Sequence, residues 1–253
     1  AYKEDKVIIP AIYSFLQQDY PRELYDIIVI SDQMQESTNE ALRQLPVRLL
    51  IADYTDSSKA KAMSLAMNAT ADIPYDAVVI MDADNTAGTS FLSELNPVFQ
   101  SGARAVQAHR TAKNTNTDIA VLDAASEEIN NSIFRSGHIA LGLSSALIGS
   151  GMALEACWFR QHIHLLETAG EDKEMEALLL KQRIHIEYLE HVYVKDEKTQ
   201  KKEGIKNQRK RWIAAQFDSL VRALPDFPKE LLRGNIDYCD KVFQWTLLPR
   251  IIL

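Results

Sequence analysis

Short apolar runs, separated by segments with helical spacing, dominate the first part of the chain. They lie at residues 6–11, 25–32, 46–52 and 77–81. Apolar runs of this length without alternation favour strands that are buried on both faces of a parallel sheet. Because helical patterns lie between them, we predict an α/β fold with a mostly parallel central sheet flanked by helices.

The rest of the chain continues to alternate between the two patterns. Ser37, followed three residues later by Glu40, matches a capping box and predicts that a helix begins there. A run that ends in a glycine turn predicts a further strand at residues 143–152. We also predict strands at residues 103–108 and 185–194 and helices at residues 120–133 and 174–182.

The pattern divides the chain near Trp212. We predict an α/β domain over residues 1–212 and a C-terminal amphipathic helical segment over residues 213–253. The last part, residues 242–253, is apolar with one charge, Arg250. It is shorter than the roughly 20 residues of a spanning helix. We therefore expect it to lie on a membrane surface or to lead into a membrane segment.

Composition narrows the function classes. The 253 residues suffice for one α/β domain with a small appendage, and the net charge of −7 argues against general nucleic-acid binding. Cys157 and Cys239 lie far apart and have no partner at metal-ligand spacing. A reducing compartment is the simplest interpretation of this cysteine usage.

Two aspartates, Asp82 and Asp84, follow the apolar run at residues 77–81. They are expected at the carboxyl edge of the sheet, where open α/β folds place their ligands. Mg²⁺ is typically held by one or two carboxylates together with phosphate oxygens. Acidic pairs also close many strands simply as turn formers, so the Asp-x-Asp spacing alone leaves both interpretations open.

Other charged segments have ordinary explanations when each is taken alone. Residues 198–211 contain seven basic residues against the single acid Glu203, and such runs are usually solvated faces. Asp172 lies in an acidic stretch that could simply begin a helix, where the helix dipole favours negative charge. Trp212 by itself would be a core anchor.

The order of these features is more specific than any one of them. It resembles the family 2 glycosyltransferases, in particular the membrane-associated branch that includes cellulose and hyaluronan synthases. The resemblance covers residues 7–253 and implies a GT-A fold with C-terminal interfacial helices. The matching features are Ile9-Pro10-Ala11, Asp32, the Asp82 and Asp84 pair, Gly170-Glu171-Asp172 and the Gln-x-x-Arg-Trp motif at residues 208–212.

The resemblance implies a role for each matching residue. Asp172 matches the catalytic base, and Asp82 and Asp84 match the pair that binds Mn²⁺ or Mg²⁺. Ser58 and Ser64 depart from the family's motif around Lys59, which has glycine and asparagine at those positions. The implied donor-binding residues are Pro10, Asp32, Lys59, Asp82 and Arg211, and the implied acceptor-binding residues are Gly151, Gln208 and Trp212.

The chemistry of inverting transfer requires these residue types. A base takes a proton from the acceptor hydroxyl while the nucleoside diphosphate leaves from the opposite face of the sugar. The leaving group needs positive charge, which a metal ion and an arginine fork provide better than lysine alone. An aromatic ring such as that of Trp212 offers a stacking face for a sugar.

One departure from the family affects the start of the chain. The predicted strand at residues 6–11 is followed at once by a helix-like segment that begins at Ile12. A strand-to-helix connection normally takes a loop of about 2 to 6 residues. We therefore infer that a loop of about a dozen residues is missing between Ala11 and Ile12.

The implied function is inverting transfer of a sugar from a UDP-sugar to a hydroxyl acceptor, in polysaccharide or glycolipid synthesis. The implied location is the cytoplasmic face of a bacterial inner membrane. The segments that would span the membrane are expected outside this chain. Two alternatives stay open: a sugar-nucleotide pyrophosphorylase and a catalytically silent nucleotide-binding, membrane-associated domain. No Gly-x-Gly-x-x-Gly follows any predicted strand, which argues against a dinucleotide dehydrogenase.

Overall fold

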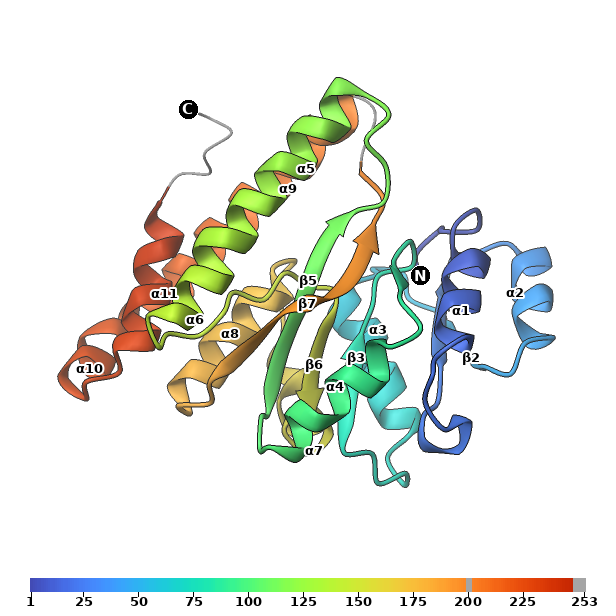
Figure 1. Ribbon diagram of the computed structural model, residues 1–253, viewed down its shortest axis with the longest axis horizontal. Coiled ribbons are helices and arrows are strands. Elements are labelled where there is room, and N and C mark those ends of the chain that lie inside the picture. The colour runs from blue at the N-terminus through green and yellow to red at the C-terminus, as the bar shows by residue number, and fades with distance from the viewer. Residues whose placement is uncertain (199–201, 248–253) are drawn as a thin grey trace.

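The protein is a layered α/β structure in which helices cover both faces of the strands (Figure 1). The computed structural model describes residues 1–198 and 202–247, and for residues 202–208 it describes the backbone alone. Five strands form one sheet in the order β3-β6-β5-β7-β4, and β1 and β2 form a separate parallel pair. The strands are β1 (Ile28–Asp32), β2 (Arg48–Ala52), β3 (Ala77–Ile80), β4 (Thr86–Ala87), β5 (Ala105–Ala112), β6 (Met152–Glu155) and β7 (Ile186–Asp196).

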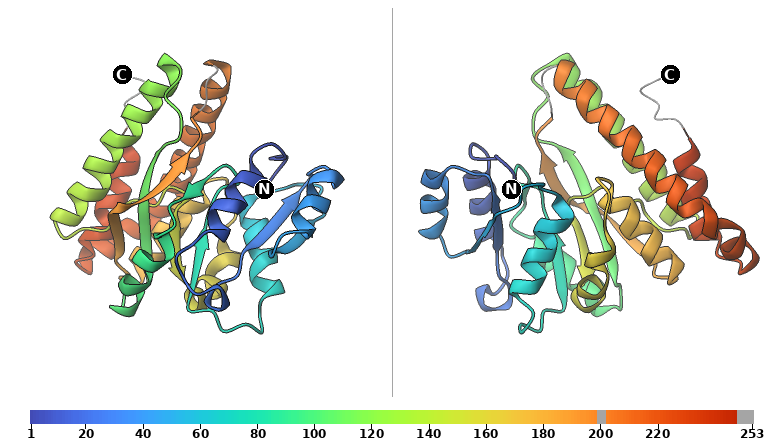
Figure 2. Two further views of the ribbon diagram at one scale, coloured as in Figure 1. Left: turned by 45° about the vertical axis from the view of Figure 1, so that its right-hand side comes forward. Right: turned by 180° about the vertical axis from the view of Figure 1, so that it is seen from behind.

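Helices pack on both faces of these strands (Figure 2). Side chains from α1 and α2 pack with Val29 of β1, whereas Met63 and Met67 of α3 pack with Ile80 of β3. The last helices, α8, α9 and α11, pack against one another. The helices are α1 (Ile8–Leu16), α2 (Glu36–Arg43), α3 (Lys59–Ala69), α4 (Phe91–Gln100), α5 (Asp118–Asn130), α6 (Gly137–Ala140), α7 (Ala156–His162), α8 (Glu171–Lys181), α9 (Lys202–Ala223), α10 (Phe227–Leu232) and α11 (Ile236–Thr246).

The α/β class is confirmed, and the sheet is mixed. The pairs β1–β2 and β5–β7 are parallel, while β3–β6, β5–β6 and β4–β7 are antiparallel. β3 is also an edge strand of its sheet, so the apolar run before Asp82 is not a central parallel strand. Its side chains are covered by helices on both faces, which explains why it reads as a strand buried on both sides.

The predicted strand at residues 6–11 is wrong, because α1 occupies this segment. Ile8, Ala11 and Ile12 are buried on one face of the helix at the i, i+3, i+4 spacing of an amphipathic helix. Pro10 lies in the first turn, where a missing N–H costs no helical hydrogen bond. Since the helix runs unbroken through Ala11 and Ile12, the reason for inferring a missing loop at this point disappears.

Two other local predictions are wrong. Residues 143–151 form no strand, and the strand that follows, β6, begins only at Met152. Helix α2 begins at Glu36 and has no side-chain cap of its own. The carboxylate of Asp5 accepts hydrogen bonds from the Gln35 N–H at 2.8 Å and from the Thr38 hydroxyl at 2.7 Å. Asp5, which is distant in sequence, therefore binds the N–H of the N-cap residue, the kind of bond that the capping box predicted for Glu40.

The remaining predicted elements are confirmed within a few residues at their ends. They correspond to β1, β2, β3, β5, β7, α5 and α8. Helix α9 runs through residues 212 and 213, so the predicted domain boundary lies inside one helix. Residues 248–253 of the apolar C-terminal run lie outside the described residues. Within the described part of the chain, no helix is both long and apolar enough to cross a membrane.

The turn before β6 depends on glycine at residue 151. Gly151 has φ +63°, and a Cβ there would lie 3.1 Å from Cγ2 of Val194. We expect Gly151→Ala to lower the free energy of unfolding by about 2 kcal/mol through the left-handed backbone and the crowding together. The melting temperature should fall by about 4–8 °C in a thermal unfolding experiment.

Two matched variants separate these two causes. Gly142 has φ +75° and open space around it, so Gly142→Ala should cost about 1 kcal/mol from the backbone alone. Gly88 has neither constraint, and Gly88→Ala should stay within about 0.5 kcal/mol of the parent. Equal melting temperatures for all three variants would contradict this account.

Candidate active site

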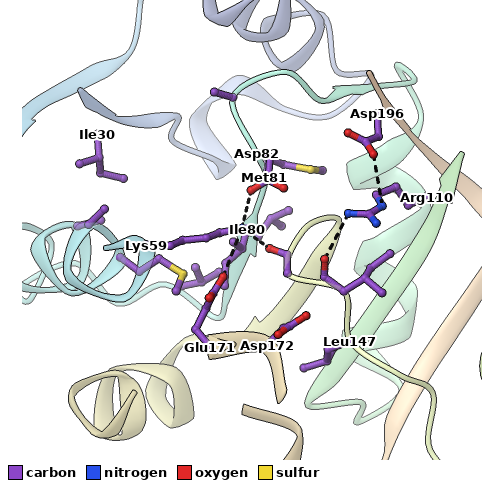
Figure 3. Close-up of a pocket in the computed structure, with 18 of the residues that line it drawn as sticks. Ile30, Lys59, Ile80, Met81, Asp82, Arg110, Leu147, Glu171, Asp172 and Asp196 are labelled. Atoms are coloured by element: carbon purple, nitrogen blue, oxygen red, sulfur yellow. Dashed lines mark hydrogen bonds and ion pairs between the residues drawn. The ribbon is translucent and has the colours of Figure 1, made fainter. Parts of the chain in front are cut away.

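A large cleft of about 2210 Å³ lies at the carboxyl ends of β1 and β3. It is lined by residues from both sheets and from α1, α3, α4, α8 and α9. Figure 3 shows how side chains distant in sequence, among them Lys59, Asp82, Arg110 and Asp172, meet around it. The lining residues that the structure describes include more acidic than basic side chains. Of the implied site residues, Asp32, Lys59, Asp82, Asp84, Asp172, Arg211 and Trp212 line the cleft.

The two aspartates after β3 are held in a tight turn by buried polar side chains. The Asp82 N–H donates to Oγ of Ser150 at 3.0 Å and to Oδ1 of Asn85 at 3.3 Å. Nδ2 of Asn85 in turn donates to Oδ1 of Asp84 at 3.1 Å and to Oδ1 of Asp196 at 3.5 Å. Both Asn85 and Ser150 are fully buried. The turn is therefore built from segments that are far apart in the sequence.

Lys59 connects this turn to α8. Its Nζ lies 2.5 Å from Oδ1 of Asp82, 3.7 Å from Oε1 of Glu171 and donates to the Gly149 carbonyl oxygen at 2.7 Å. Burial alone would lower the pKa of Lys59, but the carboxylates of Asp82 and Glu171 outweigh it and raise the pKa. Lys59 is thus a charged amine that neutralises part of the acidic cleft.

Asp172 lies in the first turn of α8, beside Lys59 and Gly149. A Cβ on Gly149 would lie 3.9 Å from Oδ2 of Asp172 and 3.6 Å from Nζ of Lys59. Gly149 has φ +77°, and its missing side chain leaves the space in front of the carboxylate open. Oδ1 of Asp172 accepts a hydrogen bond from the Lys173 N–H at 2.9 Å, whereas Oδ2 lies 3.7 Å from Nζ of Lys173, so Oδ2 remains able to accept a proton from a ligand.

The acidic surplus around Asp84 fits a divalent cation. Burial, followed by the nearby Asp196 and Asp82 carboxylates, raises the pKa of Asp84 to about 6. Within the described residues, no group of three or more His, Cys, Asp or Glu side chains could hold a metal ion by itself. Two carboxylates are enough for Mg²⁺ when phosphate oxygens and water supply the other ligands. Asp82 and Asp84 are the residues that would hold it.

A buried ion cluster forms the wall of the cleft on the β5 and β7 side. Arg110 donates to Oε2 of Glu127 at 2.8 Å and lies 3.7 Å from Oδ2 of Asp196, which Lys198 contacts at 3.0 Å. Burial opposes ionisation of Glu127, yet Arg110, Arg135 and Lys198 outweigh it and hold its pKa at about 2. Lys198, predicted to belong to a basic solvated run, is instead buried in this cluster.

Sequence reasoning gave no role to several residues of the site. Asn85 stands directly after the aspartate pair, and asparagine at such a position is a turn signal that could have found it. Arg110, Glu127 and Asp196 come together only through the pairing of β5 with β7 and the packing of α5, which no local pattern indicates. Glu171 precedes Asp172 in the Gly170-Glu171-Asp172 motif, and the sequence alone gave it no role of its own.

Three implied site residues lie elsewhere or have another environment. Pro10 is exposed in the first turn of α1 and is not among the cleft residues, so its interpretation as the end of a strand at the donor site is wrong. Gly151 is buried against Val194 and Gln107 and does not line the cleft. The backbone of Gln208 lies in α9, and its side chain is outside the described residues.

Asp32 and the α9 residues complete the cleft. Asp32 ends β1, is buried, and accepts a hydrogen bond from the Ser57 hydroxyl at 2.9 Å. Arg211 and Trp212 are exposed and line the cleft from α9, and residue Trp212 is 46% accessible to solvent. An exposed tryptophan in a cleft offers an apolar face to a ring-shaped ligand.

A family model gives the decisive comparison. The model described as "Glycosyltransferase like family 2" matches residues 1–215, most of the chain. The chain belongs to this family. No curated protein matches it.

Solved structures agree with a GT-A-like fold for this family 2 chain. The crystal structure of S. aureus TarS 1-349 has a TM-score of 0.58 at 12% identity, over 88% of this chain and 63% of that one. The TarS 1-349 complex with UDP-GlcNAc aligns with a TM-score of 0.58 at 11% identity, over 88% of this chain and 64% of that one. Mannosyltransferase PcManGT from Pyrobaculum calidifontis, in complex with GDP-Man and Mn²⁺, has a TM-score of 0.66 at 17% identity, over 97% of this chain and 71% of that one.

Lys59 gives a direct test of the electrostatics in this family 2 chain. We expect Lys59→Met to lower the free energy of unfolding by about 1 kcal/mol, because Asp82 and Glu171 lose their shared cation in a partly exposed cleft. The melting temperature should fall by about 2–4 °C. The matched control is Lys61→Met on the same helix, whose exposed amine contacts Asp56 through its carbonyl at 2.7 Å and its side chain at 3.5 Å; its loss should change stability little. Equal effects of the two variants would contradict the bridging role.

Proposed function

We propose that the chain transfers a hexose from a UDP-sugar to a hydroxyl group of a glycan or glycolipid, with inversion at the anomeric carbon. The supporting observation is the meeting of Asp32, the Asp82 and Asp84 pair and Asp172 around one cleft at the strand ends. Carboxylates with these three different surroundings suit three separate tasks: nucleotide recognition, cation binding and proton removal.

Asp172 is the base of the proposed reaction. It takes the proton from the acceptor hydroxyl as that oxygen bonds to the anomeric carbon, while the bond to the diphosphate oxygen breaks on the opposite face. Its carboxylate borders the space left open by Gly149. A cation held by Asp82 and Asp84 would supply positive charge to the leaving diphosphate. Lys59 and Arg211 also line the cleft and add positive charge to it.

Asp32 is proposed to recognise the uracil-ribose part of the donor and Trp212 to stack on the acceptor. Asp32 is buried at the end of β1, where one oxygen is engaged by Ser57. A ligand that cannot form the hydrogen bond leaves the buried polar group of the site unpaired, so such a site discriminates strongly against that ligand. This supports a single preferred nucleotide.

The proposal also includes association of the chain with a membrane, at the cytoplasmic face of a bacterial inner membrane. Large apolar side chains are exposed along the C-terminal helices, with Leu232 90% and Phe243 60% accessible. Exposed apolar side chains on amphipathic helices favour binding in the interface of a bilayer. Among the described side chains, those on α9 to α11 are Trp212, Phe217, Val221, Leu231, Leu232, Ile236 and Phe243.

Calorimetric titration tests the donor site first. UDP, GDP and ADP are titrated separately into the chain, each with Mn²⁺ and again with EDTA. We expect UDP alone to bind, and only with the metal, because the acidic cleft repels a diphosphate that brings no cation. Tight binding of all three nucleotides, or of UDP in EDTA, would contradict the proposed donor.

A further inference from the structure

The backbone beside the proposed base, Asp172, is held by side chains from other elements. Residues 147–149 belong to no helix or strand. The Ile148 N–H donates to Oε1 of Gln107 at 3.1 Å. The next residue, Gly149, borders the base, since a Cβ there would lie 3.9 Å from Oδ2 of Asp172. The distance between this segment and the base therefore depends on the side chains that hold the segment.

Glu176 holds the start of the same segment. It lies one helical turn after Asp172 on α8, so the two side chains are on the same face of the helix. Oε1 of Glu176 accepts a hydrogen bond from the Leu147 N–H at 2.6 Å. Glu176 is only 2% exposed, yet it lines the cleft. One side chain thus connects the helix that carries the base to the backbone beside that base.

Lys241 of α11 forms an ion pair with Glu176 inside the protein. Its Nζ lies 3.8 Å from Oε1 of Glu176, and both residues are almost fully buried. Burial raises the pKa of Glu176 and lowers that of Lys241, while the opposite charge of each partner counteracts this effect. Nζ of Lys241 has no hydrogen-bond partner in the described part of the chain. Lys241 therefore contributes charge compensation to the pair.

Stability is a weak explanation for this ion pair. The free energy needed to bury two charges is often as large as their attraction, and apolar residues of similar volume can then replace them without loss of stability. The ammonium group of Lys241 adds to that cost, because it is buried without a hydrogen bond. An apolar residue in place of Glu176 could not accept the Leu147 N–H, which would be left unpaired in the interior.

We propose that Glu176 is a positioning residue for the sugar transfer. By holding the Leu147 N–H, it fixes Gly149, two residues further on, relative to the base. The acceptor hydroxyl has to enter the space between Gly149 and Asp172, so a small shift of the segment would misplace that hydroxyl and slow the reaction. Lys241 compensates the charge of Glu176. This inference rests on the proposed function, because it concerns the same reaction.

Two double variants separate positioning from stability, because both remove the ion pair and both fill its volume with unbranched side chains. One combines Glu176→Gln with Lys241→Met, and its amide oxygen can still accept the Leu147 N–H. The other combines Glu176→Met with Lys241→Met, and it leaves that N–H without an acceptor. Transfer is measured as UDP release from UDP-glucose, UDP-galactose and UDP-N-acetylglucosamine, with cellobiose and chitobiose as acceptors. Calorimetry with UDP and Mn²⁺, thermal unfolding and hydrogen exchange of the Leu147 amide complete the comparison with the parent chain.

We expect the double variant with glutamine to keep kcat within about threefold of the parent value and the one with methionine at residue 176 to lose about 10- to 100-fold. KM for the donor and the affinity for UDP should change less than about threefold in both, since Lys59 keeps its ion pairs with Asp82 and Glu171. The Leu147 amide should exchange about tenfold faster in the methionine variant than in the glutamine variant.

Asp237→Leu is the matched control. Asp237 of α11 accepts a hydrogen bond from the Ser144 N–H at 2.8 Å, and neither residue lines the cleft. The control removes a bond of the same kind from the preceding backbone, so the melting temperature should fall by about 4 °C while kcat stays at the parent value.

Equal kcat values for the two double variants would overturn the assignment of Glu176. A loss of kcat in Asp237→Leu as large as in the methionine double variant would overturn it as well. A parent chain that binds UDP but transfers sugar from none of the donors would instead contradict the proposed function, and the role of Glu176 would fall with it.

Discussion

The Asp172→Asn variant is expected to lose sugar transfer by about 10²- to 10⁴-fold while it binds UDP and Mn²⁺ nearly as well as the parent chain. The amide keeps the shape of the side chain and cannot take the proton from the acceptor hydroxyl. The donor site should change little, because Lys59 forms its ion pairs with Asp82 and Glu171, and the charge of Asp172 raises the pKa of Lys59 less than either of those carboxylates does. Transfer is measured by release of UDP with a sugar acceptor present, and binding by calorimetry.

The matched control for this variant is Asp72→Asn, an exposed aspartate outside the cleft, which should transfer sugar at the parent rate. Full activity of Asp172→Asn would remove the base from the proposed mechanism. Binding of UDP by a parent chain that transfers no sugar to any acceptor would instead support a catalytically silent nucleotide-binding domain.

The Asp84→Asn variant is expected to weaken UDP binding in the presence of Mn²⁺ by about 10- to 100-fold, while in EDTA neither the variant nor the parent chain should bind UDP. Removing one negative charge relieves the cost of its burial and the repulsion from Asp196 and Asp82, which together raise the pKa of Asp84 to about 6. The free protein should therefore be as stable as the parent chain or more so, while its cation site loses one of two carboxylates. Calorimetric titration and thermal unfolding of the same sample give both quantities.

This combination of higher stability and weaker binding is specific to a cation site. A purely structural aspartate would lose stability when replaced, since its partners would be left unpaired. Asp123→Asn is a suitable control, because burial also raises the pKa of Asp123, in the same cleft but away from the β3 turn. Its Mn²⁺-dependent binding of UDP should match that of the parent chain.

Buried apolar runs identified most strands, but they could not tell a strand from a helix at residues 6–11. The run Val7-Ile8-Ile9 satisfies both periods over so short a length, and Pro10 suited a strand end as well as a first helical turn. What decided for the helix was contact with Val29 and Leu42, which belong to other elements. The order of the sheet, and with it the mixed pairing, depends equally on such distant contacts.

The candidate site was predictable where a residue stands at the end of a strand or the start of a helix. Asp32, Asp82 and Asp172 have such positions, and all three line the cleft. Residues that support them were not predictable in this way. Ser150 and Asn85 hold the Asp82 turn through contacts between segments 65 residues apart in the sequence, and no spacing rule covers that distance.

The division of the strands between two sheets affects any ligand that spans the cleft. Asp32 belongs to the β1–β2 pair, whereas Asp82 and Asp84 follow β3 of the five-stranded sheet. A nucleotide bound at both places would connect the β1–β2 pair to the five-stranded sheet. It would therefore oppose any motion that separates these two parts of the protein. Donor binding should therefore stiffen parts of the chain that never touch the donor, and the loss of the leaving nucleotide should loosen them again.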